Sequence, residues 1–142
     1  MKKTLFNDNW EKWEKWNKLA ADPIFEHKFD MPLSSMRDMA YAQIKRVTEE
    51  KLFSVFDFDN DKKNIFTAHE MLGNINGSLA TKFTVQFNLF GGTLMALHTD
   101  RHLPFMRKID SLENMGCFGF TELGYGNNAP KMETTATYDK EK

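Results

Sequence analysis

The sequence is poor in several residue patterns, and each scarcity excludes a class of protein. Its 142 residues contain one cysteine, Cys117, so no disulfide can form within the chain. The most apolar stretch, residues 79–97, is interrupted by Lys82, Gln86 and Asn88. Because a spanning helix needs about 20 mainly apolar residues, we predict no membrane span. The first residues also lack the long apolar segment of a secretory signal.

Charge of one sign is also lacking. The chain has 19 basic and 20 acidic residues, with a net charge of -1. Nucleic-acid binding relies on a basic excess that neutralises phosphates, so we expect no nucleic-acid partner. Hydrophobic residues make up 41% of the chain, and its 13 phenylalanines and nine methionines predict one domain with a large, aromatic core.

Apolar spacing of three to four residues predicts a mainly α protein. In the first helix, Trp10, Trp13 and Trp16 recur every third position, and Asp22-Pro23 ends it. The predicted helices cover residues 9–20, 34–53, 63–74, 79–90 and 101–111. Their predicted caps are Ser34 or Ser35 for the second and Ser78 for the fourth, and residues 56–61 are predicted as a loop.

The same spacing predicts which side chains face the core. The second helix would bury Met36, Met39, Ala40, Ile44 and Val47, and the third would partly bury Ile65, Phe66, Ala68, His69 and Leu72. The fourth is apolar nearly all round, so we expect it at the centre. Gly91-Gly92 would kink it or let another part of the chain come close.

The pattern changes after Gly116. Residues 117–121 and 133–138 are rich in β-branched and aromatic side chains and predict two strands around a turn-rich loop. We therefore expect a helical domain over residues 1–114 and the start of a β domain over residues 115–142. Two strands rarely stand alone in water, so we expect the natural chain to continue.

Several short motifs fail on their spacing. Acidic residues at 57, 59 and 61 open like a calcium loop, but Lys62 and Ala68 replace the required Gly and Glu. His98 and His102 lack a third ligand, so we predict no metal site. The pattern from Gly124 to Ala129 resembles a dinucleotide fingerprint, but no helix follows it. A lone cysteine in a strand favours a buried apolar role for Cys117 over a nucleophilic one.

Two longer motifs carry a resemblance to a known family. GCFGFTELGYGNN at residues 116–128 is followed by METTATYD at residues 132–139, and both resemble the acyl-CoA oxidase family. FGGT at residues 90–93 and LHTDRH at residues 97–102 also fit, and the resemblance covers nearly the whole chain. It implies an N-terminal helical domain, a central β domain and a C-terminal helical bundle, with FAD between the last two.

The resemblance also implies a chemistry. The family removes two hydrogens from a fatty acyl-CoA, passes a hydride to FAD and reduces O2 to hydrogen peroxide. By analogy, the cofactor-binding residues are Phe118, Phe120, Thr121, Gly124 and Gly126. The family's carboxylate base lies in the C-terminal bundle, so we assign no catalytic residue here and give Glu122 a structural role.

Some residues depart from the family pattern. Tyr125 stands where His is usual, Asn127 where Ser or Thr is usual, Pro130-Lys131 where Arg-Gly is usual, and His98 where Gly is usual. They motivate an alternative, a shortened non-catalytic subunit for structure or assembly. A helical binding module unrelated to the family is a third reading. Family analogy places the protein in the peroxisome, with the mitochondrion as alternative, as a homodimer or with a partner covering the missing domains.

Overall fold

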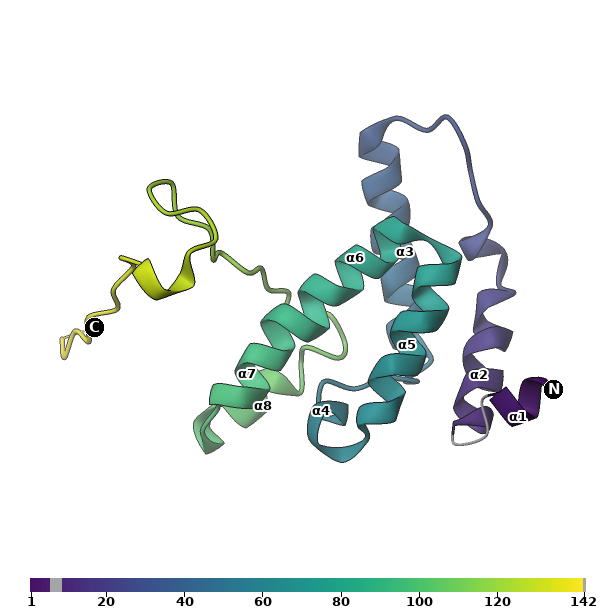
Figure 1. The fold of residues 1–142 in the computed structure, drawn as a ribbon, viewed down its shortest axis with the longest axis horizontal. Helices are drawn as coiled ribbons and strands as arrows, with labels where there is room; N and C mark the ends of the chain where they lie inside the picture. Colours follow the sequence, from purple (N-terminus) through teal and green to yellow (C-terminus); the bar gives the residue numbers. More distant parts are fainter. Residues whose placement is uncertain (6–8, 142) are drawn as a thin grey trace.

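The computed structural model describes residues 1–5 and 9–141. A bundle of helices is followed by an extended segment that leaves it (Figure 1). The α-helices are α1 (Lys2–Leu5), α2 (Trp10–Ala20), α3 (Leu33–Glu49), α4 (Asp57–Asn60), α5 (Lys62–Ile75), α6 (Gly77–Phe83), α7 (Gly92–Leu97) and α8 (Leu103–Met106). The 3-10 helices are η1 (Pro23–Phe25), η3 (Asp100–His102) and η4 (Ala129–Lys131), and η2 (Thr84–Gly91) is a π-helix.

One long helical run organises the bundle. Helix α6 continues without a break into η2 and α7, and α3 and α5 both pack against α6 (Figure 1). Helix α2 packs on the other side of α5. The predicted central position of the apolar run is therefore confirmed.

The predictions for α2 and α5 are confirmed within one residue at each end. In α2, Trp16 and Leu19 are buried, and Trp13 packs partly buried against the same core. Lys12, on the same helix, forms an ion pair with Asp61, the N-cap residue of α5. The stripe of apolar residues therefore lies where its spacing placed it, and an ion pair at its edge joins two helices.

Helix ends were predicted less well. Helix α3 begins at Leu33 after Pro32, so Ser34 and Ser35 lie inside it, and it ends at Glu49 rather than near residue 53. Asn76 caps α6 by accepting a hydrogen bond from the Ser78 N–H at 2.8 Å, so Ser78 is not the cap. The predicted loop at residues 56–61 contains α4, and residues 101–111 form only part of η3, then α8 and turns.

The predicted core faces are correct in part. Ala40, Ile44 and Val47 are buried as expected, but Met36 is 38% exposed and Phe66 is 75% exposed. The prediction missed Gln43, a buried residue of α3. Its amide donates to the Ile24 carbonyl at 2.9 Å and accepts from Asn76 at 3.2 Å, so burial leaves it paired.

Asp110 connects the turn after α8 to the loop before α4. Its carboxylate accepts hydrogen bonds from the Ser54 hydroxyl and from the Val55 N–H, the latter at 2.8 Å. Burial raises the pKa of Asp110, and the two hydrogen bonds act against that rise. The contact fixes Val55, which is fully buried, against the middle of the long helical run.

The two predicted strands do not form. Residues 117–121 and 133–138 are assigned to no strand, and the described residues after Gly116 contain a single isolated bridge, between Glu122 and Gly126. Cys117 is exposed, so its predicted burial was wrong. A strand needs a ladder partner, and this segment has none within residues 1–5 and 9–141. In that part of the chain, no helix is long and apolar enough to cross a bilayer.

Gly91, at the end of η2, is predicted to tolerate no side chain. A Cβ there would lie 2.7 Å from Cγ2 of Val55, a stiff and fully buried side chain. We expect Gly91→Ala to destabilise the fold by about 1–3 kcal/mol in urea unfolding. The matched change Gly73→Ala in α5 meets nothing within 4 Å and should instead stabilise it by about 0.5–1 kcal/mol. Equal effects of the two changes would contradict the close approach at Val55.

Candidate functional site

The predicted cofactor-binding residues lie together on the exposed segment that follows the helical bundle. Phe118 and Phe120 stack with ring centroids 5.5 Å apart and an angle of 13° between the ring planes. Phe118 is 42% exposed. The segment therefore presents a pair of aromatic rings to its surroundings rather than to the helical core.

A tight turn follows the aromatic pair. The Thr121 hydroxyl donates to the Asn127 side chain at 3.1 Å, and the Gly126 N–H donates to the Glu122 carbonyl at 2.7 Å. Gly126 has φ +57°, a left-handed conformation that glycine adopts without strain. The structure thus brings Thr121 close to Asn127, one of the positions that departs from the family pattern.

Glu122 fastens the next part of the segment onto this turn. Its carboxylate accepts hydrogen bonds from the Thr134 hydroxyl, from the Glu133 N–H at 2.8 Å and from the Thr134 N–H at 2.7 Å. The Thr134 hydroxyl and then the Glu133 N–H hold the pKa of Glu122 below its ordinary value. A carboxylate engaged in this way favours the structural role that we assigned to it.

The segment has free hydrogen-bonding groups for a ligand. Within the described chain, the backbone N–H groups of residues 117–121 donate to no protein acceptor. A Cβ added at Gly119 or Gly124 would meet nothing within 4 Å, so the space beside the backbone is open there. Exposed rings, free N–H groups and open space fit a flat, hydrogen-bond-accepting group such as the flavin that the resemblance implies.

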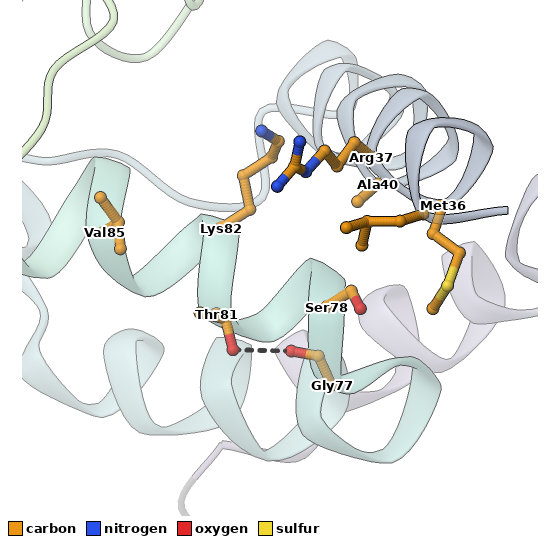
Figure 2. A pocket seen from close by; sticks show the side chains of 9 residues that line it. Met36, Arg37, Ala40, Gly77, Ser78, Thr81, Lys82 and Val85 are labelled. Carbon is orange, nitrogen blue, oxygen red and sulfur yellow. Dashed lines mark hydrogen bonds between the residues drawn. The ribbon is translucent and has the colours of Figure 1, made fainter.

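A pocket of about 480 Å³ lies between α3 and α6 and was not predicted. Figure 2 shows the side chains that line it. Its apolar wall includes Leu33, Met36, Ala40 and Val85. Thr81 also lines it, and its hydroxyl donates to the Gly77 carbonyl within α6 at 2.9 Å. A largely apolar hollow of this size is typical of small-molecule sites.

Two cations stand at the edge of this pocket. Figure 2 shows Arg37 of α3 and Lys82 of α6 reaching toward the same rim. Neither forms an ion pair with another residue that the structure describes. Lys82 could have been singled out from the sequence, because it is a charged residue within the apolar run of residues 79–97. Nothing in the sequence distinguishes Arg37 from other exposed cations.

The rejected metal motifs serve local structure. The Asp57 carboxylate accepts from the Asn64 side chain at 2.6 Å, and Asp61 caps α5. Nδ1 of His102 accepts from the Thr99 N–H at 2.9 Å at the start of η3, and His98 contacts the Met95 carbonyl. Among the residues that the structure describes, no group of three His, Cys, Asp or Glu side chains is arranged to hold a metal ion.

Glu122 makes the turn sensitive to acid. Because its folded-state pKa is lowered, its hydrogen bonds are present above the ordinary glutamate pKa of about 4.3 and are lost as pH falls through the lower folded-state value. In an NMR titration, the Thr134 N–H resonance should move with a midpoint below the ordinary glutamate pKa of about 4.3. Glu122→Gln should abolish this movement. A midpoint above the ordinary value would contradict the observed hydrogen bonds.

The chain is similar to several curated acyl-coenzyme A oxidases. It is 32% identical over 130 residues to peroxisomal acyl-coenzyme A oxidase 3 of Homo sapiens. The alignment covers 90% of this chain and 19% of the human protein. It is 31% identical over 148 residues to acyl-coenzyme A oxidase 2 of Yarrowia lipolytica, covering 97% and 20% respectively. Acyl-coenzyme A oxidase acox-3 of Caenorhabditis elegans is 28% identical over 123 residues, covering 86% and 18%.

No protein-family model and no solved structure matches the chain. The chain spans about a fifth of the length of the curated relatives that it matches. The matches nevertheless extend over most of its own residues, including both the helical bundle and the segment that follows it. The chain therefore belongs to the acyl-CoA oxidase family.

Proposed function

We propose that the chain is the N-terminal portion of an FAD-dependent acyl-CoA oxidase that desaturates fatty acyl-CoA to trans-2-enoyl-CoA and reduces O2 to hydrogen peroxide. The observation that carries this proposal is the similarity to named acyl-CoA oxidases over most of the chain. Residues 1–114 would form the helical domain and residues 115–142 the start of the β domain. The name of the human relative supports a peroxisomal location.

The pocket between α3 and α6 suits a fatty acyl-CoA. An acyl chain is apolar and coenzyme A carries several phosphates, so the substrate needs an apolar hollow with cations beside it. Val85 and Ala40 line such a hollow, and Arg37 and Lys82 stand at its rim. The acyl chain would occupy the hollow, and the two cations would attract the phosphates.

The exposed segment would hold FAD. The backbone near Phe118 and Phe120 and the Thr121 hydroxyl would hydrogen-bond the flavin or its ribityl chain, and Gly124 and Gly126 would let the loop pass close to it. When bound, FAD would accept the hydride from the β carbon of the substrate and return both electrons to O2. The Thr121 hydroxyl would first have to turn from Asn127 toward the ligand.

The chain itself would bind and orient rather than transfer the proton. Removal of the α proton needs a carboxylate whose pKa is near the working pH. The lowered pKa of Glu122 makes it a weak base, and its oxygens are already engaged by Glu133 and Thr134. The base would come from a part of the enzyme outside these residues.

The alternative function is a non-catalytic subunit for structure or assembly. The observation that favours it is the exposure of large apolar side chains: Phe66 and Leu97 are each 75% exposed, and Leu33 is 63% exposed. Such side chains lose contact with water when a partner covers them. The two functions differ in whether the covering surface belongs to the same polypeptide.

The intact mass of the endogenous protein distinguishes the two functions. The protein would be captured with an antibody against residues 10–20, weighed by mass spectrometry and assayed for hydrogen peroxide release from palmitoyl-CoA. The oxidase proposal expects a mass several times the 16.6 kDa of this chain, bound FAD and peroxide release. A mass near 16.6 kDa without FAD would contradict it and favour the assembly subunit.

The two cations at the pocket rim give a second prediction. We expect the double variant Arg37→Ala, Lys82→Ala to weaken palmitoyl-CoA binding to this chain about tenfold, measured by calorimetry. The phosphates of the ligand would lose their charge-assisted contacts with the two cations. The double variant Lys28→Ala, Lys45→Ala removes the same charge from exposed positions outside the pocket. Equal weakening in both variants would show that binding follows net charge and not the pocket.

A further inference from the structure

Gln86 is a buried polar residue that the proposed chemistry does not use. It lies in the π-helix η2 and is 2% exposed. Its amide donates to the Asn114 carbonyl at 2.9 Å and to the Ile109 carbonyl at 3.4 Å, and its oxygen accepts from the Gly116 N–H at 3.1 Å. One side chain therefore holds three backbone groups of the turn that precedes the exposed segment.

The ring of Phe90, one turn further along η2, packs against the backbone at Gly116. A Cβ at Gly116 would lie 2.1 Å from Cγ of Phe90, so only glycine lets the backbone pass this close to the ring. Phe90 also packs edge-on against Phe105 with centroids 6.2 Å apart. Gly116 therefore meets two residues of η2, because its N–H donates to Gln86 and its Cα lies against the ring of Phe90.

Gly116 is the last residue that ties the segment to the bundle by hydrogen bonds. In the part of the chain that the structure describes, the hydrogen bonds of residues 117–141 run only within that segment. The direction in which the chain leaves the bundle is therefore set at Gly116 (Figure 1). Phe118 follows two residues later, and Thr121 five residues later.

We propose that Gln86 is a positioning residue that sets the course of residues 117–134, which rests on the proposed function in so far as this segment holds FAD. Gln86 touches neither the predicted cofactor-binding residues nor the pocket. It acts through the backbone at Gly116. Val85, its neighbour in the chain, lines the pocket between α3 and α6, so one turn of helix serves both the pocket and the segment.

The test compares two buried glutamines. Gln86→Leu removes the amide and keeps a side chain of similar size, whereas Gln43→Leu does the same in α3, where the amide bonds Ile24 and Asn76. Cys117 is the sole cysteine and is exposed, so a fluorophore attached to it reports the mobility of the segment. Hydrogen exchange at the Gly116 N–H reports the hydrogen bond between Gly116 and Gln86.

We expect Gln86→Leu to speed exchange of the Gly116 N–H about tenfold and to lower the anisotropy of the Cys117 label, because the N–H loses its acceptor. Gln43→Leu should leave both unchanged. If Gln86→Leu leaves both readouts at the values of the unmodified chain while helicity is retained, the positioning role is overturned.

A second measurement needs no variant and covers the case in which Gln86→Leu fails to fold. In the unmodified chain, the Gly116 N–H should exchange at least about tenfold more slowly than the N–H groups of residues 117–121, which have no protein acceptor. Equal exchange at Gly116 and Cys117 would overturn the proposal. Neither readout involves FAD, so their failure would leave the proposed oxidase function unaffected.

Discussion

The packing of Phe53 against Phe83 and Phe87 holds the helical bundle together. The ring of Phe53 lies 5.0 Å from Phe83 and 5.2 Å from Phe87, and both contacts are edge-on. His69 of α5 also packs edge-on against Phe83, with ring centroids 5.3 Å apart. Each such contact adds about 0.5–1.5 kcal/mol beyond the area it buries. The cluster joins the loop after α3, helix α5 and the long helical run, so the walls of the pocket depend on it.

The sequence predicted the helices that are defined by the spacing of their own apolar residues. It did not predict the features that depend on partners elsewhere in the fold. The tryptophan stripe of α2 is an example of the first kind, because residues three and four apart share one face. The strands at residues 117–121 and 133–138 are an example of the second kind. Their composition suits a strand, but a strand exists only where a neighbour completes its ladder.

The three polar residues that interrupt the apolar run were the strongest signal for the site. Lys82 stands at the pocket rim, Gln86 holds Gly116, and the Asn88 amide contacts Nε2 of His69 at 2.8 Å. In the sequence alone, the same three residues argue against a membrane span. Most buried polar groups are hydrogen-bonded, so a polar residue in an apolar helical run marks a place where another element or a ligand meets that helix. Arg37 could not be found this way, because a cation on an exposed helix face is ordinary.

Both parts of the proposed site therefore depend on one stretch of backbone. Helix α6 and the start of η2 supply the pocket residues Thr81, Lys82 and Val85, and η2 supplies Gln86 and Phe90, which fix the start of the exposed segment. The distance and angle between the pocket and the segment are those of a continuous helix. Rigid elements hold ligand groups more precisely than loops do, which suits a reaction between two bound molecules.

The π-helix η2 sets how α7 is rotated about the helix axis relative to α6. A π-helix pairs each N–H with the carbonyl five residues earlier, so it accommodates one residue more than an α-helix over the same span. Loss of one residue within Thr84–Gly91 would therefore restore α geometry while α7 keeps nearly the same phase relative to α6. Loss of one residue within α6 would instead rotate everything beyond it by about 100° and turn Gly91 away from Val55. A change of one residue in length therefore disturbs the contact with Val55 less in the π-helix than in α6.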